Sequence, residues 1–366
     1  MRIAQVAPLY ESVPPGLYGG TERVVSWLTE ALVKAGHEVT LFASGDSVTS
    51  ALLVPCCKSA LRLDPDSIDH LAHHVLMIET VFQQADSFDL IHFHTDYLHF
   101  PYARREQIPC LTTLHGRLDI PDLVPIYREF RDLPLVSISD AQRKPLPWVN
   151  WVGTVYHGMP QDSLVPTLTA GHYLAFLGRV SPEKGLDRAI EIAIRSGMPL
   201  KVAAKVDRAD QDYYESRIKP MLQNSLIEFV GEIGNSEKSE FLGNAAALLF
   251  PVDWPEPFGV VMIEAMACGT PVIACPLGSV PEVVRPGISG ILIKDVNEGV
   301  QAVRRIGEID RSRVRHHFEL NFTDELMASN YLNIYQQLVD SKPASLQVEK
   351  EVLSWMEGES QTPSTT

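Results

Sequence analysis

The sequence predicts an α/β protein with two doubly wound, Rossmann-like domains, and three observations lead to this fold class. A chain of 366 residues exceeds one average domain, so two are expected. Short apolar runs alternate with amphipathic segments, the order of parallel strands joined by crossover helices. This alternation pauses in a polar stretch at residues 166–171 and then restarts. We therefore expect an N-terminal domain over residues 1–168, a C-terminal domain over residues 169–340 and a tail over residues 341–366.

The first domain shows six apolar runs of strand length, each followed by turn residues or an amphipathic segment. Two segments have the length and spacing of helices, and Gly36 supplies a stop for the first of them. The expected strands are residues 2–7, 38–43, 89–94, 110–115, 135–139 and 154–156, and the expected helices are residues 21–35 and 67–85.

The second domain repeats this alternation. Its expected strands are residues 173–177, 200–206, 227–230, 247–251, 271–274 and 290–293, and its expected helices are residues 186–196, 211–222, 236–244 and 259–268. A last long helix at residues 324–339 could pack on either domain, including back on the first. Within the tail, residues 348–356 could form one more helix.

Composition excludes several classes of function. Hydrophobic residues make up 45% of the chain and charged residues 21%, so it can bury a full core and is neither disordered nor fibrous. Asp and Glu outnumber Lys and Arg by 46 to 31, which gives a net charge of −15. This balance disfavours general nucleic-acid binding and attraction to anionic lipid headgroups, since both depend on basic side chains.

Cysteine usage and the N-terminus indicate a compartment. The five cysteines are an odd number, form no C-x-x-C pair and include the adjacent Cys56 and Cys57, which are poor disulfide partners. Residues 1–10 lack the length and cleavage signature of a signal peptide, and no apolar run approaches the roughly 18 residues of a membrane span. We expect a cytoplasmic protein.

The strongest chemical signal is the segment DWPEPFGVVMIEAMACGTP at residues 253–271, in which Glu256 and Glu264 are eight positions apart. The prolines on either side of Glu256 hold the chain extended, because a residue before proline avoids the α conformation. A helix beginning at about Phe258 then places Glu264 roughly 9 Å further along its axis. The two carboxylates can therefore contact different parts of one elongated ligand.

Between these glutamates lies a predicted helix N-terminus. Its free N–H groups suit a phosphate, because they point outward and the helix dipole favours negative charge there. They belong to Phe258, Gly259, Val260 and Val261. The alternative is an ordinary loop–helix junction with an apolar helix face in the core.

A second signal is GRVSPEKG at residues 178–185, directly after the first strand of the second domain. Arg179 and Lys184 would lie at the edge of the cleft, where a planar guanidinium and a point charge suit a diphosphate. The alternative is a solvated salt bridge, for instance between Glu183 and Lys184.

A third signal is YGGTER at residues 18–23, between the first strand and the first helix. Gly19 and Gly20 permit close backbone approach to a ligand. Thr21 is a suitable N-cap, and Glu22 is favourably placed in the first turn. This loop is not the G-x-G-x-x-G fingerprint of dinucleotide binding, which disfavours a dehydrogenase.

Together these three motifs resemble those of the retaining GT-B glycosyltransferases, the group 1 or GT4 family. GG-x-E-R follows the first strand, GR-x4-KG opens the second domain, and E-x-FG-x4-E is followed by A-x-A-x-G-x-PV. The resemblance extends over about residues 2–340, and the order and spacing of the motifs fit throughout. It implies the GT-B fold, in which two Rossmann-like domains face each other across a cleft.

The resemblance implies that the second domain binds a nucleotide-diphosphate sugar and the first binds the acceptor. Arg179 and Lys184 match the family's diphosphate clamp, Glu256 the carboxylate facing the sugar, and Glu264 the one that binds ribose hydroxyls. His115 matches a histidine near the reacting sugar. Further donor contacts implied are Gly19 and Gly20, Val230 and Gly231 beside the base, and Phe258, Gly259, Val260 and Val261 at the sugar and distal phosphate.

The implied reaction transfers a glucose- or mannose-type hexosyl group from a UDP- or GDP-sugar with retention. Arg179, Lys184 and the helix N-terminus would stabilise the leaving diphosphate, each by ~2–4 kcal/mol. In the mechanism usually argued for the family, the acceptor attacks from the face that the diphosphate leaves, and a phosphate oxygen accepts its proton. Glu256 would position the sugar, with covalent nucleophile as its alternative role, and His115 would hydrogen-bond the sugar.

The expected acceptor-side contacts are Glu22, His94, Asp96, Tyr97 and Asp140. The histidines of this region show neither H-E-x-x-H nor a fixed ligand geometry, and no D-x-D lies at a likely donor loop. We therefore expect a metal-independent transferase without a cofactor. Residues 61–88 contain Arg62 as their only basic residue, which favours a soluble acceptor over a membrane lipid.

Two other classes of function remain open from sequence. A nucleotide-sugar epimerase of the same architecture would consume donor without an acceptor, and it would need an acid–base pair at the sugar. A non-catalytic nucleotide-sugar binding protein would show no turnover with any donor.

Overall fold

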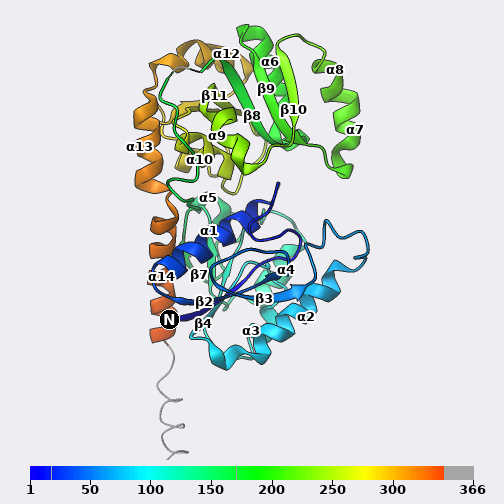
Figure 1. Ribbon diagram of the computed structural model, residues 1–366, viewed down its shortest axis with the longest axis vertical. Helices are drawn as coiled ribbons and strands as arrows, with labels where there is room; N and C mark the ends of the chain where they lie inside the picture. Colours follow the sequence, from blue (N-terminus) through cyan, green and yellow to red (C-terminus); the bar gives the residue numbers. More distant parts are fainter. Residues whose placement is uncertain (18, 170, 342–366) are drawn as a thin grey trace, which may run out of the picture.

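A computed structural model describes residues 1–17, 19–169 and 171–341 as two α/β units stacked along the long axis of the molecule (Figure 1). Each unit is built on one parallel sheet, and the strand order of both sheets is doubly wound. The predicted helix at residues 348–356 lies outside the described residues.

The N-terminal unit contains a seven-stranded sheet in the order β3-β2-β1-β4-β5-β6-β7. Its strands are β1 (Arg2–Val6), β2 (Glu38–Ser44), β3 (Leu52–Cys57), β4 (Leu90–Phe93), β5 (Cys110–Thr113), β6 (Leu135–Ser137) and β7 (Trp151–Thr154). Its helices are α1 (Gly20–Lys34), α2 (His70–Gln83), α3 (Phe100–Ala103), α4 (Leu123–Glu129) and α5 (Asp140–Arg143).

Alternate residues of each central strand in this unit face opposite layers of helices, because the side-chain period of a strand is two. On β1, Ala4 packs in a core with α2, α3 and α4. Its neighbour Ile3 packs on the other face against α1 and the last helix, α14 (Asp324–Asp340). Both faces are covered, which explains the nearly continuous apolar runs of these strands.

The C-terminal unit contains a six-stranded sheet in the order β10-β9-β8-β11-β12-β13. Its strands are β8 (Tyr173–Arg179), β9 (Leu200–Lys205), β10 (Ile227–Gly231), β11 (Ala245–Phe250), β12 (Val272–Ala274) and β13 (Gly290–Leu292). Its helices are α6 (Leu186–Ser196), α7 (Gln211–Tyr213), α8 (Lys219–Met221), α9 (Asn235–Gly243), α10 (Val260–Ala267), α11 (Val280–Val283), α12 (Val296–Arg305) and α13 (Arg311–Asn321).

The chain crosses between the two units twice. It passes upward after β7 and returns after α13, so that α14 runs alongside the N-terminal unit (Figure 1). At the crossing the two segments are hydrogen-bonded: Met159 N donates to Phe322 O at 2.9 Å, and Asp324 N donates to Met159 O at 3.1 Å. The last helix therefore belongs to the core of the unit in which the chain begins.

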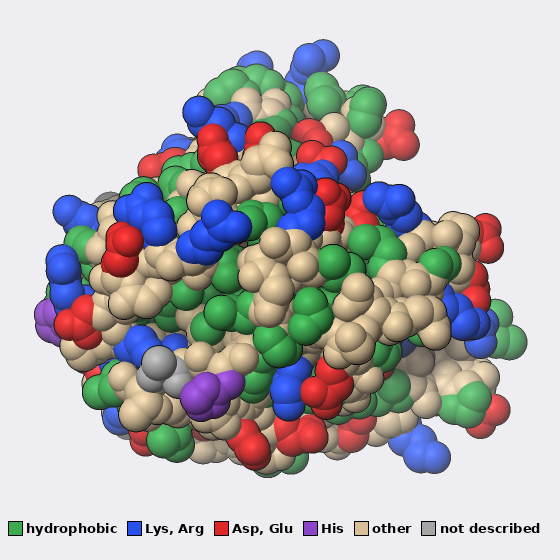
Figure 2. Space-filling view, turned by 90° about the horizontal axis from the view of Figure 1, so that it is seen from above, with side chains coloured by type: hydrophobic (Ala, Val, Ile, Leu, Met, Phe, Trp, Pro, Cys, Tyr) green, Lys and Arg blue, Asp and Glu red, His purple; other side chains and the backbone are tan. Residues whose placement is uncertain are grey.

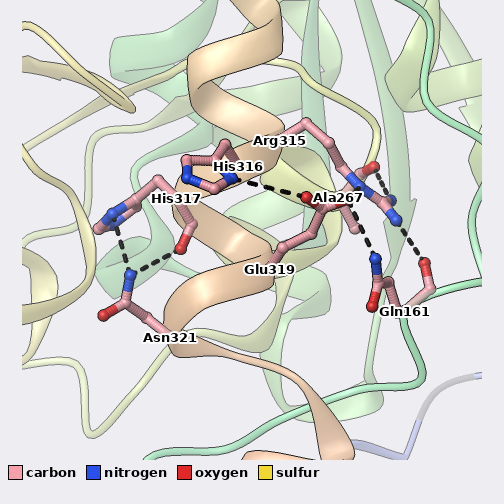
Figure 3. A network of polar contacts seen from close by, with 7 residues as sticks. All are labelled: Gln161, Ala267, Arg315, His316, His317, Glu319 and Asn321. Carbon is pink, nitrogen blue, oxygen red and sulfur yellow. Dashed lines mark hydrogen bonds and ion pairs between the residues drawn. The ribbon is translucent and has the colours of Figure 1, made fainter.

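Helix α13 is fixed to its surroundings by Arg315 (Figure 3). This guanidinium donates to the carbonyl of Ala267 at the end of α10 (2.6 Å) and to that of Gln161 in the first crossing segment (2.7 Å). It also pairs with Glu319 one turn further along α13 (2.7 Å). Arg315 thus binds α13, the helix that leads back to the N-terminal unit, both to the end of α10 and to the first crossing segment.

Several element predictions were wrong. β3 was not predicted, because it contains Pro55 and is an edge strand whose side chains are largely half-exposed, so it lacks an apolar run. The strand expected at residues 154–156 lies at Trp151–Thr154. Helices α12 and α13 were also not predicted, because few of their side chains are apolar.

The surface at the end of the long axis formed by the C-terminal unit mixes both signs of charge (Figure 2). Lys and Arg side chains are interspersed there with Asp and Glu. The net charge of −15 is therefore not gathered into a single acidic patch on that face.

Candidate active site

A cleft of about 600 Å³ lies between the two units, where the carboxyl ends of both sheets face each other. Ligands of doubly wound sheets bind at this edge, because loops and helix N-termini converge there. Most residues that the sequence singled out line this cleft. They are Gly19, Gly20, Glu22, His94, Asp96, Tyr97, His115, Arg179, Lys184, Glu256, Phe258, Gly259, Val260, Val261 and Glu264.

The centre of the cleft is an ion pair between Lys184 and Glu256. Lys184 Nζ lies 2.6 Å from Glu256 Oε2, and both side chains are largely buried. Trp254 donates its indole N–H to the same oxygen (2.9 Å), and the Lys184 ammonium lies 5.0 Å from the centre of the Trp254 ring. One carboxylate oxygen and one aromatic ring therefore fix the position of the ammonium.

Helix α10 presents its N-terminus to the cleft directly after this glutamate. Gly259 adopts a left-handed conformation (φ 78°), and a Cβ there would lie 2.9 Å from Met262 Cε. The first backbone bond of the turn runs from Met262 N to Gly259 O. The N–H groups of Val260 and Val261 precede it and are left to a ligand or solvent.

Arg179 lies at the end of β8 among carboxylates. It contacts Glu183 (2.6 Å), Asp210 (3.4 Å) and Asp207 (3.9 Å). The salt bridge considered from sequence between Glu183 and Lys184 is therefore not the one found, since each of these residues pairs elsewhere. The cleft holds two cations in defined places, Lys184 on Glu256 and Arg179 on an acidic loop.

A second buried ion pair joins Glu264 of α10 to Lys238 of α9, with Nζ and Oε1 2.5 Å apart. Next to it, Arg23 of α1 reaches across from the N-terminal unit. Arg23 hydrogen-bonds the side chain of Asn235 and donates to the carbonyl of Leu17 at 2.7 Å. Two cations thus adjoin the glutamate that the sequence assigned to a ribose.

Sequence reasoning did not assign Arg23, Lys238 and His157, all of which line the cleft. Arg23 belongs to the quoted GGTER motif, so its position one turn after the glycine pair was a usable signal. No sequence signal identified Lys238 and His157, because neither belongs to a motif and only the fold brings them to the cleft.

Histidines form the wall on the N-terminal side. His115 follows β5, and its Nε2 lies 2.8 Å from Nδ1 of His94, which follows β4. His157 stacks on His115 with ring centres 5.2 Å apart. Burial lowers the pKa of His115 to about 3 and holds the pKa values of His94 and His157 well below the usual range, so all three rings are neutral at pH 7.

The expected acceptor side is a polar pocket at the start of α1 and the ends of β1 and β4. Glu22 is buried there, and burial raises its pKa to about 7. Tyr10, Arg62 and His74 also line this part, and Arg62 pairs with Glu11 at 2.8 Å. The pocket therefore offers hydroxyl-binding groups of several kinds.

Three of the expected site residues do not line the cleft. Asp140 begins α5 outside it, where its carboxylate accepts a hydrogen bond from Thr154 Oγ1 at 2.7 Å. Val230 and Gly231 end β10, and it is the following Glu232 and Ile233 that reach the cleft. Tyr18, the first residue of the glycine motif, lies outside the described residues.

Within the described part of the chain, no three His, Cys, Asp or Glu side chains converge into a group that could hold a metal ion. No helix in those residues is long and apolar enough to cross a membrane.

Two family models match the chain, one for each unit. The model described as "Glycosyltransferase Family 4" matches residues 18–157, and that described as "Glycosyl transferases group 1" matches residues 168–316. The two matches follow one another in the order of the units and together take in most of the chain. The chain belongs to the group 1 glycosyltransferases.

Relatives of this glycosyltransferase span nearly the whole chain. A phosphatidyl-myo-inositol mannosyltransferase of Mycolicibacterium smegmatis is 26% identical over 353 residues, which cover 86% of each chain. The sucrose-phosphate synthase of Thermosynechococcus elongatus superposes with a TM-score of 0.76 at 20% identity, over 93% of this chain and all of the other. The Anabaena protein HepE, in complex with UDP and glucose, gives a TM-score of 0.71 at 16% identity, over 91% of this chain and 98% of the other. The fold of the glycosyltransferase is GT-B.

Proposed function

We propose that this glycosyltransferase moves a glucose- or mannose-type hexosyl group from a UDP- or GDP-sugar to a hydroxyl of a soluble acceptor, with retention and without a metal ion, in the cytoplasm. The observation that carries the proposal is the pairing of Lys184 with Glu256 beside the N-terminus of α10, inside the interdomain cleft. A cation, a carboxylate and free N–H groups there match the parts of a nucleotide-diphosphate sugar.

In this proposal the diphosphate lies between Arg179, Lys184 and the start of α10. Breaking the bond from the anomeric carbon to the phosphate oxygen leaves negative charge on the diphosphate. The two cations and the N–H groups of Val260 and Val261 stabilise that charge in place. Gly19 and Gly20 approach the diphosphate from the opposite unit.

Glu256 then binds hydroxyls of the transferred sugar and stabilises the positive charge that develops on it. Glu264 binds the ribose, with Lys238 holding its carboxylate. The residues that follow β10, Glu232 and Ile233, border the base in place of Val230 and Gly231, which do not line the cleft. The acceptor enters beside Glu22, Asp96 and Tyr97, and a departing phosphate oxygen takes its proton on the same face as bond cleavage.

The donor and acceptor classes rest on further support. One relative is named a mannosyltransferase, and one structural neighbour holds UDP and glucose. The acceptor side carries Arg62 as the only basic residue of residues 61–88, and it is already paired with Glu11. A lone, compensated cation favours a small polyol or sugar over an anionic membrane surface.

The test is incubation of the purified enzyme with each common UDP- and GDP-sugar and a panel of polyol and sugar acceptors, with release of nucleoside diphosphate as the readout. We expect release from one class of donor, dependent on acceptor, and unchanged by EDTA. NMR of the product gives the anomeric configuration, which should match that of the donor. Inverted product, EDTA-sensitive turnover, or no turnover across the panel would each contradict the corresponding part of the proposal.

A further inference from the structure

A chain of buried hydrogen bonds leads from His115 in the cleft to the last helix. His115 Nε2 meets His94 Nδ1 at 2.8 Å, and His94 Nε2 meets the side-chain carbonyl of Gln5 at 2.8 Å. Gln5 Nε2 lies 3.1 Å from the hydroxyl of Tyr335 on α14. Three strands and one helix thus contribute to a single polar line.

The line continues behind the strands. Tyr335 OH lies 2.7 Å from His92 Nδ1, and His92 Nε2 lies 2.8 Å from Thr113 Oγ1. Thr113 Oγ1 in turn lies 2.9 Å from the hydroxyl of Tyr331. These side chains share the sheet face that α14 covers, because β1 and β4 present every second residue to it.

The donor and acceptor of each hydrogen bond in the line can be assigned, because some of its groups can only donate or only accept. The Gln5 carbonyl oxygen only accepts, so His94 donates from Nε2, and the Nδ1 of a neutral His94 accepts. His115 must then donate from Nε2. On the other side the Gln5 amide donates to Tyr335, whose hydroxyl donates to His92 Nδ1. Each hydrogen bond from His115 to His92 then joins one donor to one acceptor.

The burial of the line keeps it in this order. Gln5, His92, His94 and Tyr335 are at most 2% exposed, and a buried polar group without a partner costs about 1–3 kcal/mol. Burial also holds the pKa values of His92 and His94 well below their usual range, so neither ring carries a second proton. A neutral ring in a fixed line has one tautomer.

We propose that Tyr335 and Gln5 are positioning residues for glycosyl transfer, which hold His115 with its proton on Nε2 and a lone pair on Nδ1. This rests on the proposed function and on the family resemblance, which implies that His115 lies beside the donor sugar. The His115 ring lines the cleft, and its Nδ1 is buried without a partner among the described residues, which costs free energy until a donor contacts it. A lone pair there accepts a hydrogen bond from a sugar hydroxyl and disfavours a carboxylate at the same place.

The test compares two buried tyrosines of α14: Tyr335, which bonds Gln5 directly, and Tyr331, which lies at the far end of the line, beyond His92 and Thr113. Tyr335→Phe removes the hydroxyl between Gln5 and His92 and leaves the Gln5 amide nitrogen, within the described part of the chain, with a single long contact, 3.5 Å to His92 Nδ1, so the orientation of the amide is held less firmly. Tyr331→Phe removes a hydroxyl of the same helix face that, among the described residues, is hydrogen-bonded to Thr113 alone. Long-range ¹H–¹⁵N spectra of protein labelled with ¹⁵N-histidine report which ring nitrogen carries the proton, and a His115→Gln variant identifies the signal.

We expect the wild-type His115 to carry its proton on Nε2 alone. Tyr335→Phe should add a population protonated on Nδ1 and lower kcat by about two- to tenfold, the rate equivalent of one hydrogen bond, with KM for the nucleotide sugar unchanged. Tyr331→Phe should change neither the His115 tautomer nor kcat. Its thermal unfolding temperature should nevertheless fall by about as much as that of Tyr335→Phe, because each variant loses one buried hydroxyl. Gln5→Met, which removes the acceptor of His94, should resemble Tyr335→Phe.

A wild-type His115 protonated on Nδ1 would overturn the proposal, because it requires the Gln5 amide to lie the other way round. Equal effects of the two tyrosine variants on kcat and on the spectra would overturn it as well. If the wild-type enzyme transfers no sugar, the proposed function is contradicted instead. The spectra would still report the tautomer of His115.

Discussion

At the scale of single residues, the ion pair with Glu256 fixes the position of the Lys184 ammonium. Their charged groups are 2.6 Å apart in a partly closed cleft, where removing one partner leaves the other uncompensated. Trp254 shares the same carboxylate oxygen, so the ammonium is held in position before a donor arrives. A diphosphate that enters meets a cation whose orientation is already fixed.

Replacing Lys184 by Met should lower kcat by about 10²–10³-fold, the loss expected for one preorganised group that stabilises transition-state charge. Nucleoside diphosphate release under saturating donor measures it. Lys219→Met, at an exposed lysine of α8, serves as the control and should retain wild-type rates. A Lys184→Met enzyme within about threefold of wild type would contradict the assigned role.

Glu22 gives a pH dependence of stability with a defined sign. Burial raises its pKa to about 7 in the folded protein from an ordinary value of 4.5, so its stabilising contribution is complete below pH 4.5 and is lost as the pH rises through 7. Relative to Glu22→Gln, the free energy of unfolding of the wild type should fall by about 3 kcal/mol between pH 4.5 and pH 7.5. Urea denaturation of both proteins at several pH values measures this, and parallel curves would show that Glu22 does not titrate in this range.

At the scale of elements, the buried guanidinium group of Arg311 fixes α13 to the C-terminal unit. Arg311 is 8% exposed and donates to the carbonyls of Thr167, Gly243 and Ala245, each at 2.7 Å, and to the hydroxyl of Thr270 at 2.6 Å. One side chain thus binds the carbonyls of a loop residue, of the last residue of α9 and of the first residue of β11.

Arg311→Met should therefore destabilise the protein by about 3 kcal/mol or more, because several buried acceptors lose their donor at once. Chemical denaturation measures the loss. Arg313→Met removes an exposed arginine of the same helix and should stay within about 0.5 kcal/mol of wild type. If both variants lose similar free energy of unfolding, the loss comes from a lower stability of the helix itself and not from the buried contacts of Arg311.

The sequence predicted most of the sheets, because buried parallel strands are continuous apolar runs between turn residues. It failed at the edges, where β3 carries Pro55 and β7 is half-buried along its length, so that neither shows such a run. It also missed α13, in which only Arg311, Val314 and Phe318 are buried and one of these is charged.

The candidate site was predictable where it is local. Glu256, the start of α10 and Lys184 lie in motifs whose spacing implies their geometry, and the structure brings them together. Lys238 and His157 reach the cleft only through the fold, and no local pattern identifies them. Asp140 was expected on the acceptor side from its place after a strand, but that loop turns toward the contact between the units.

At the scale of the whole molecule, one carboxylate joins the two units on the far side of the cleft. Glu282 of α11 accepts hydrogen bonds from the backbone N–H groups of Asp140 and Ala141, both at 2.8 Å, and from Tyr156 OH at 3.1 Å. An acceptor from the C-terminal unit thereby caps α5 of the N-terminal unit. The relative position of the units is thus partly set by a polar contact.

Glu282→Ala should loosen this contact and shift the ligand-free enzyme toward more open arrangements, because its three donors then turn to water. Small-angle X-ray scattering should show a larger radius of gyration than for wild type. Glu298→Ala removes a carboxylate that accepts from Lys294 N within the C-terminal unit, and its scattering should match wild type. Unchanged scattering for Glu282→Ala would show that this carboxylate does not set the arrangement.

The double crossing of the chain determines where chimeras of such proteins can be joined. Because α14 fills the core of the N-terminal unit while following the C-terminal unit in sequence, the chain has no single point at which it divides into two complete halves. A chimera that exchanges donor specificity must be joined at two places, once between β7 and β8 and once between α13 and α14. A graft joined only at the first would import a foreign last helix into the N-terminal core, and with it a foreign partner for Gln5.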